Sequence, residues 1–138
     1  MVGQLKNLLE RFQSSAYARR QPLVLINGLA EQAEKSPRAL PLGQRKRLEV
    51  ARAIALDPKL LLLDEPLAGL SSAEATTMAD LVRTLPGEGI TVLLVEHNLG
   101  EVLRVADRLV VLDAGRVLAE GAPAEVMARD DVRKAYTG

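Results

Sequence analysis

The sequence contains no cysteine and no tryptophan, and its only aromatic residues are one phenylalanine and two tyrosines. A chain without cysteine forms neither disulfides nor thiolate metal sites, which fits a reducing compartment. So few aromatic side chains argue against the base-stacking surfaces of nucleic-acid-binding modules. Eighteen basic residues balance 18 acidic ones, so no net charge attracts nucleic acid either. We therefore expect no nucleic-acid partner.

Long apolar runs are also missing. The longest, such as residues 60–63 and 92–95, are far shorter than the ~18 residues that suggest a membrane span. The N-terminal stretch lacks the continuous apolar segment and the small-residue cleavage site of a signal peptide. These features favour a cytoplasmic protein.

The chain does contain a leucine run that ends in two acidic residues. Residues 60–63 lie between Pro58 and Pro66, which predicts a strand buried on both faces, followed by Asp64 and Glu65. In an open α/β sheet, ligands bind at the carboxyl ends of the strands. Two adjacent carboxylates repel each other unless a cation lies between them. The simpler interpretation is a pair of solvated acids at a strand-to-loop corner.

Apolar strands alternate with amphipathic helices along the chain, which predicts an α/β fold: a mostly parallel sheet covered by helices. A hairpin with a three-residue turn follows, adds antiparallel edge strands to this sheet, and leads to short helices. We expect helices at 45–56, 71–85, 99–106, 123–127 and 132–136, strands at 60–63 and 90–95, and hairpin strands at 108–112 and 116–118. Before them we expect a helix at 4–12, a linker at 13–21, a short strand or helical segment at 22–28 and a helical turn or two at 29–35.

Several short motifs follow one another in a fixed order. They are Leu40-Pro-Leu-Gly-Gln44, the basic helix at 45–52, Asp64-Glu65-Pro66, Ala68-Gly-Leu-Ser71, and His97 at the end of the second strand. From about Gly28 to Gly138 this set resembles the ATP-binding subunits of ABC transporters, and residues 1–27 match that family poorly. The resemblance implies a partial P-loop NTPase-type fold, with residues 28–138 forming the C-terminal half of the ATPase domain. Residues 45–52 and 131–138 also resemble the branched-chain amino-acid uptake branch.

The resemblance implies a role for the loop before the basic helix. Leu40, Pro41, Leu42, Gly43 and Gln44 stand at the signature loop, which contacts the ATP of a second ATPase subunit in a head-to-tail dimer. The usual serine of this loop is replaced by Pro41. We expect Gly43 just before the helix N-terminus, where free backbone N–H groups suit a phosphate. A Gly-Gln turn that merely starts a helix is the alternative.

Four further residues match functional positions of the family. Asp64 stands at the Walker B aspartate, which holds Mg²⁺, usually through water, and Glu65 at the catalytic glutamate. His97 stands at the switch histidine, although a lone histidine is more often a solvated loop residue. Ser71 replaces the usual aspartate of the D-loop and also begins a capping-box pattern with Glu74.

The basic residues after the signature loop, Arg45, Lys46 and Arg47, are most simply a solvated helix face. Asn98 is expected to cap the helix that follows His97.

The phosphate-binding loop of the family is absent from the sequence. No Gly-x-x-x-x-Gly-Lys-[Ser/Thr] occurs, and none of the lysines follows a glycine. We therefore expect a truncated product, a fragment or one part of a split protein, inactive alone.

The resemblance implies an ABC importer, with MgATP as cofactor, permease subunits as partners and a place on the inner face of the cell membrane. The alternatives are a non-catalytic binding module that pairs with a P-loop-bearing ATPase, and a soluble ABC-type ATPase without a permease.

Overall fold

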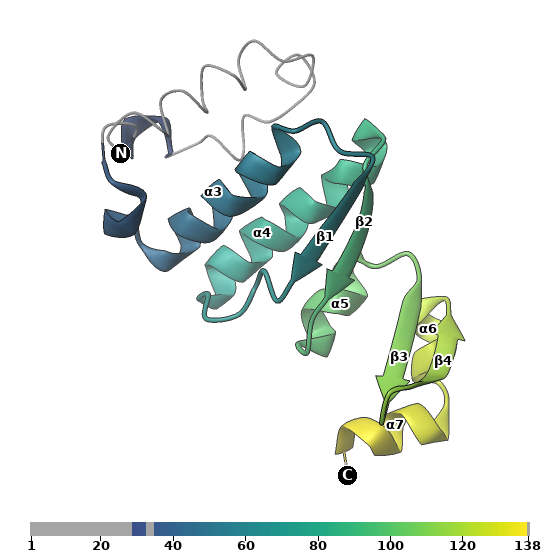
Figure 1. The fold of residues 1–138 in the computed structure, drawn as a ribbon. Coiled ribbons are helices and arrows are strands. Elements are labelled where there is room, and N and C mark those ends of the chain that lie inside the picture. Colours follow the sequence, from purple (N-terminus) through teal and green to yellow (C-terminus); the bar gives the residue numbers. More distant parts are fainter. Residues whose placement is uncertain (1–28, 33–34, 138) are drawn as a thin grey trace. The chain divides into compact units, whose positions relative to one another are not determined.

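The computed structural model describes residues 29–32 and 35–137. The helix, linker and strand expected before residue 28 lie outside these residues. The chain divides into two compact units, an N-terminal unit of residues 1–97 and a C-terminal unit of residues 98–138. The elements of both units are labelled in Figure 1. The predicted domain division at residues 27 and 28 stays a prediction.

The N-terminal unit alternates helices with two strands. Its longest elements are α3 (Leu42–Ile54), β1 (Leu60–Asp64), α4 (Ser72–Thr84) and β2 (Thr91–Val95), joined in places by the short 3-10 helices Ala30–Gln32, Pro37–Ala39 and Leu85–Glu88. Strands β1 and β2 pair in parallel, from Leu60 opposite Thr91 to Asp64 opposite Val95. Helix α4 is the connection between them, so the predicted strand–helix–strand unit is confirmed.

Helix α3 begins earlier than the sequence indicates. The expected start was Arg45, but the helix starts at Leu42, with Pro41 in the N-cap position. Proline suits this end of a helix because it has no N–H that needs a partner. The first hydrogen bond of the helix runs from the amide of Arg45 to the carbonyl of Pro41. Gly43 therefore lies inside the first turn, and its expected position before the helix was wrong.

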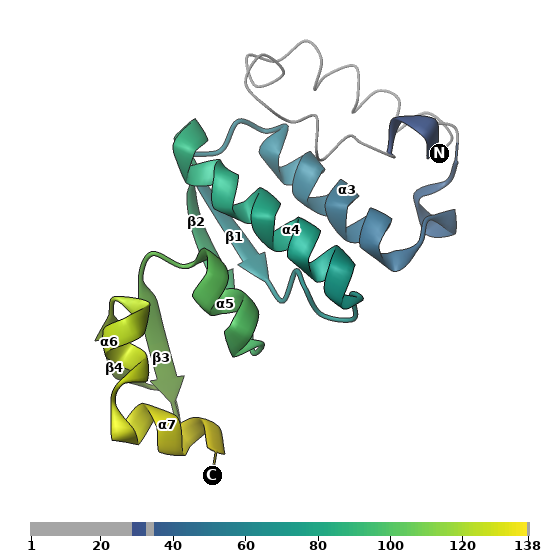
Figure 2. The ribbon, with the colours of Figure 1, turned by 180° about the vertical axis from the view of Figure 1, so that it is seen from behind.

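The core of this unit lies between the sheet and its two long helices. Figures 1 and 2 show α3 and α4 on the same face of the β1–β2 sheet. On that face, Leu61 and Leu63 of β1 form one buried cluster with Ile54 of α3 and Met78 of α4. Buried aliphatic contacts of this kind fix the strand ends relative to the helices, which positions the residues that follow β1 and β2.

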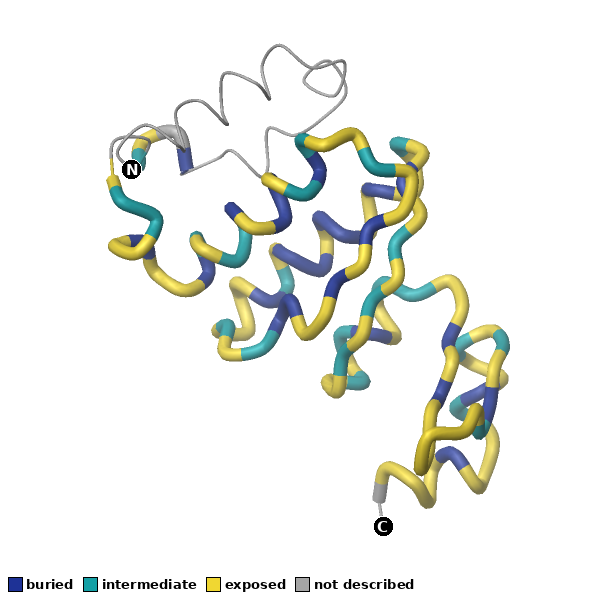
Figure 3. Tube along the Cα trace, viewed as in Figure 1, coloured by how far each residue is buried: buried dark blue, intermediate teal, exposed yellow. Residues whose placement is uncertain are grey.

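The prediction that β1 is buried on both faces was wrong. Leu60 and Leu62 are 54% and 64% exposed, and Leu93 and Val95 of β2 are more than half exposed on the same side. Buried and exposed residues alternate along β1 in Figure 3. The physical reason is that both described long helices of this unit pack against one face, so a strand of apolar residues keeps one side open.

The C-terminal unit packs three helices and a hairpin around its own core. It consists of α5 (Leu99–Val105), β3 (Leu109–Asp113), β4 (Arg116–Gly121), α6 (Pro123–Met127) and α7 (Asp130–Thr137). Its core comprises Val102, Leu109, Val111, Ala119, Val126 and Val132.

The hairpin differs from its prediction in two ways. Strands β3 and β4 form a two-stranded sheet of their own and are not edge strands of the parallel sheet. Asp113 pairs with Arg116, so the turn has two residues rather than three. Ala114 and Gly115 both have positive φ, 44° and 77°, as in the turns whose twist matches that of the flanking strands.

Among the residues that the structure describes, no helix combines the length and the apolar character needed to cross a membrane.

Candidate active site

The carboxyl ends of β1 and β2 bring Glu65 and His97 together. The amide of Glu65 donates to the carbonyl of Val95 at 2.9 Å, so the ladder continues one residue past Asp64. Glu65 then adopts φ of 44° and turns the chain away from the strand. A left-handed conformation costs a non-glycine residue ~1 kcal/mol or more. This cost falls on the residue that the sequence singled out for catalysis.

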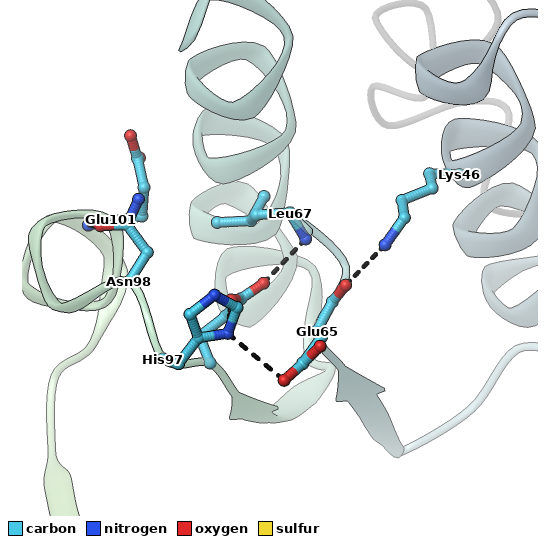
Figure 4. A network of polar contacts seen from close by, with 7 residues as sticks. Lys46, Glu65, Leu67, His97, Asn98 and Glu101 are labelled. Carbon is cyan, nitrogen blue, oxygen red and sulfur yellow. Dashed lines mark hydrogen bonds and ion pairs between the residues drawn. The ribbon is translucent and has the colours of Figure 1, made fainter. Parts of the chain in front are cut away.

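The side chains of Glu65 and His97 face each other. His97 Nδ1 lies 3.3 Å from Glu65 Oε1, and the two side chains are 53% (Glu65) and 71% (His97) exposed. Figure 4 shows the contact between the ring and the carboxylate. Both side chains are more than half exposed, so the pair is open to a ligand.

Lys46 reaches the same turn from helix α3. Its Nζ donates to the backbone carbonyl of Glu65 at 2.6 Å, as Figure 4 shows. Besides belonging to the predicted basic face, Lys46 thus ties α3 to the Glu65 turn through its ammonium. No sequence pattern signals this contact, because it joins residues from different elements.

Glu96 also went unrecognised in the sequence. Its Oε1 accepts the backbone N–H of Leu67 at 2.7 Å, and its side chain is only 1% exposed. The position just before His97, at the end of an apolar strand, is the one signal that pointed to it. The carboxylate joins the end of β2 to the turn that follows Glu65.

The signature-loop residues pack against the start of helix α4. A Cβ atom on Gly43 would clash with the carboxylate of Glu74, and one on Gly69, whose φ is +75°, would lie 3.0 Å from Leu42. Glycine at position 43 leaves room for the Glu74 carboxylate, and the left-handed φ of Gly69 favours glycine there. The loop before α3 and the loop before α4 therefore form one surface.

The other predicted members of the signature loop are spread around this surface. Leu40 is buried with Leu29 and Leu48, whereas Pro41 and Leu42 are exposed. The Gln44 side chain has a buried Oε1 atom with no hydrogen-bond partner in the described part of the chain.

Ser71 and Glu74 form the predicted capping box. The amide of Glu74 donates to Ser71 Oγ at 3.4 Å, and the amide of Ser71 donates to Glu74 Oε2 at 3.0 Å. The hydrogen bonds from the side chain and backbone of Ser71 hold the pKa of Glu74 below its ordinary value, and the charge of Arg47 acts in the same direction. The Ser71 hydroxyl is thus used within its own helix cap.

Asn98 caps its helix as predicted. Its Oδ1 accepts the amide of Glu101 at 3.4 Å, at the start of α5.

Asp64 lies at the end of β1 with its side chain exposed. Among the described residues, no group of three or more histidine or acidic side chains is arranged to hold a metal ion. Mg²⁺ needs six oxygen ligands in octahedral geometry. The described residues therefore do not fit Mg²⁺ by themselves, and Asp64 supplies at most one ligand of a site completed from elsewhere.

Two family models match the chain. The ABC transporter model matches residues 4–68, and the model of the branched-chain amino acid ATP-binding cassette transporter matches residues 116–138. The first match includes the signature loop, Asp64 and Glu65, and it also takes in residues 4–27. His97 lies outside both matches.

Relatives of known family are similar over most of this chain. BraF of Pseudomonas aeruginosa, a high-affinity branched-chain amino acid transport ATP-binding protein, is 41% identical over 80% of this chain and 44% of its own length. LptB of Haemophilus influenzae, a lipopolysaccharide export system ATP-binding protein, is 39% identical over 72% of this chain and 42% of its own.

A solved structure shares the fold. The crystal structure of a nucleotide-free ATP-binding cassette from an ABC transporter superposes with a TM-score of 0.77 at 26% identity, covering 100% of this chain and 63% of that one. The chain spans about half the length of the curated relatives that it matches. On its motifs, its fold and these matches, the chain belongs to the ATP-binding proteins of ABC transporters, and its last residues match the branched-chain amino-acid group of that family.

Proposed function

We propose that this chain supplies the ATP-hydrolysing residues of an ABC transporter that takes up branched-chain amino acids. The match at residues 116–138 and the similarity to BraF support this substrate class. LptB serves an export system and is nearly as similar, so overall identity alone does not select between import and export. The C-terminal match is the feature that favours amino-acid uptake.

The observation that carries the proposal is the 3.3 Å contact between His97 Nδ1 and Glu65 Oε1. Because His97 occupies one carboxylate oxygen, the other oxygen of Glu65 is left to orient a water molecule and accept its proton. Bound MgATP would supply the phosphorus atom that the water attacks. The parallel pairing of β1 with β2 places Glu65 and His97 next to each other, at the ends of the two strands.

The first turn of α3 has a separate role in the proposal. The amides of Leu42, Gly43 and Gln44 have no partner within the helix, since intrahelical bonding begins with Arg45. Such N–H groups, together with the positive end of the helix dipole, suit a phosphate. We infer that this turn faces the ATP of a second ATPase subunit in a head-to-tail dimer.

The remaining features of the proposal follow the family. Asp64 would help to hold the Mg²⁺ of a bound nucleotide through a water molecule. The partners are a second ATPase subunit and the permease subunits, and the chain lies on the cytoplasmic face of the membrane.

The test is a double-mutant cycle on ATP hydrolysis. The chain is combined with the P-loop-bearing segment of a related ATP-binding protein, and Glu65→Gln, His97→Ala and the double variant are compared. Residues that act as a unit are strongly non-additive, so the double variant should be about as slow as the slower single variant. Independent effects that simply multiply would show that the two residues do not form one hydrolytic unit.

A second candidate is a non-catalytic module that offers only its signature loop. One observation favours it: a Cβ atom on Gly43 would meet the Glu74 carboxylate, so the first turn of α3 packs closely against the start of α4. In this case the chain stimulates an intact P-loop-bearing ATPase subunit. The stimulation would be lost on Gln44→Ala and would survive Glu65→Gln, which separates the two candidates.

A further inference from the structure

Glu96 is the most deeply buried acidic side chain near the candidate site, and the proposed hydrolysis does not use it. It stands between the last residue of β2 and His97. A carboxylate that is 1% exposed loses much of its hydration, so it needs hydrogen bonds to compensate. The two carboxylate oxygens of Glu96 have different surroundings.

The first oxygen holds the turn that carries Glu65. Glu96 Oε1 accepts the amide of Leu67 at 2.7 Å, and the dashed line at the Leu67 nitrogen in Figure 4 marks this bond. Leu67 lies two residues beyond Glu65, whose left-handed φ of 44° needs support from its surroundings.

The second oxygen is buried without a partner. Glu96 Oε2 has no hydrogen bond within the described residues, and it lies 4.0 Å from His97 Nδ1. The same nitrogen lies 3.3 Å from Glu65 Oε1. His97 Nδ1 thus lies near two carboxylate oxygens, the exposed Oε1 of Glu65 at 3.3 Å and the buried Oε2 of Glu96 at 4.0 Å.

We propose that Glu96 is a positioning residue that clamps the Glu65 turn and serves as an alternative acceptor for the Nδ1–H of His97. This role rests on the proposed function, in which Glu65 and His97 face the attacking water. Glu96 Oε2 is buried without a partner among the described residues and lies 4.0 Å from His97 Nδ1. A small movement of the imidazole therefore brings the Nδ1–H within hydrogen-bond distance of this oxygen.

The test uses the nucleotide-free chain and two substitutions that separate the two roles. His97 is the only histidine, so ¹⁵N-histidine spectra contain a single imidazole, whose two nitrogen shifts report the tautomer. In Glu96→Gln the amide oxygen must still face Leu67, which directs the NH₂ group at His97 Nδ1. Two donors then face each other, and under alkaline conditions the ratio of the Nε2–H to the Nδ1–H tautomer should rise about threefold or more.

Glu96→Ala tests the clamp. Hydrogen exchange of the Leu67 amide should become about 10-fold faster in Glu96→Ala, because the acceptor is lost, and should stay within about threefold of the parent in Glu96→Gln. Glu49→Gln, an exposed carboxylate on α3, is the matched control and should change neither measurement.

Either of two results overturns the proposal. An unchanged tautomer ratio in Glu96→Gln removes the acceptor role, and an unchanged Leu67 exchange rate in Glu96→Ala removes the clamp. Neither measurement needs ATP hydrolysis, so a failure here is distinguishable from a failure of the proposed function.

Discussion

At the scale of single residues, the candidate site combines one residue of left-handed backbone with close contacts from neighbouring elements. Glu65 has a left-handed backbone, and Lys46 binds its carbonyl. Gly43 leaves space for the carboxylate of Glu74. Functional sites are the places where such local costs are expected, since the surrounding fold offsets them.

The capping box predicts a pH dependence. Hydrogen bonds from Ser71 lower the pKa of Glu74, so its charge stabilises the folded chain fully above the ordinary pKa of glutamate. This stabilisation is lost as the pH falls through the lowered pKa of the folded state. Glu74→Gln should therefore be less stable than the parent chain near neutral pH, and the difference should disappear in acid. Urea unfolding across this pH range measures it.

Glu49→Gln serves as the control for that series, because Glu49 is exposed on the same unit. A Glu74→Gln difference that persists unchanged into acid would show that the charge of Glu74 does not stabilise the fold.

At the scale of elements, patterns confined to one segment were predictable. The capping box of α4 and the Asn98 cap follow from short sequence signals. The parallel pairing of β1 with β2 follows instead from the strand–helix–strand order of the elements. The start of α3 was missed because glycine close to proline resembles a loop, whereas Pro41 here is the N-cap.

Contacts between segments distant in the sequence had no local signal. The bonds made by Lys46 and Glu96 join residues 19 and 29 positions apart, so sequence periodicity contains no information about them. The role proposed for Glu65 and His97 comes from the order of several motifs together, and it stays a prediction.

The β3–β4 turn offers an element-scale prediction. Ala114 has a φ of 44°, which disfavours any residue with a Cβ atom. Ala114→Gly should leave the free energy of unfolding of the C-terminal unit unchanged or raise it by up to about 1 kcal/mol. Ala128→Gly is the matched control, since Ala128 is right-handed with φ of −73°, and it should lower stability by about 0.5–1 kcal/mol.

Thermal unfolding of the three chains measures these differences. An equal loss of stability from both substitutions would show that the turn at Ala114 is not left-handed.

At the scale of the whole molecule, the N-terminal unit keeps a sheet face of apolar side chains exposed. Leu60, Leu62, Leu93 and Val95 are each more than half exposed on β1 and β2. Exposed strands of this composition favour self-association. Because the helices pack against one face only, β1 is not buried on both faces as predicted, and a substitution on its open face should affect self-association more than stability.

Leu62→Lys should reduce self-association in light scattering and change the free energy of unfolding by no more than about 0.5 kcal/mol. Leu62 is 64% exposed, whereas its neighbour Leu61 is 5% exposed. Leu61→Lys places a charge in the core and should destabilise the chain by several kcal/mol. Equal behaviour of the two variants would contradict the packing of β1.

The most direct test of the central claim is the rate of ATP hydrolysis in Glu65→Gln. The variant is combined with a P-loop-bearing segment of a related ATP-binding protein, and nucleotide affinity is measured alongside turnover. If Glu65 activates the attacking water, turnover should fall about 100-fold or more while nucleotide affinity changes little. Turnover equal to that of the parent chain would contradict the claim that Glu65 and His97 form the hydrolytic centre.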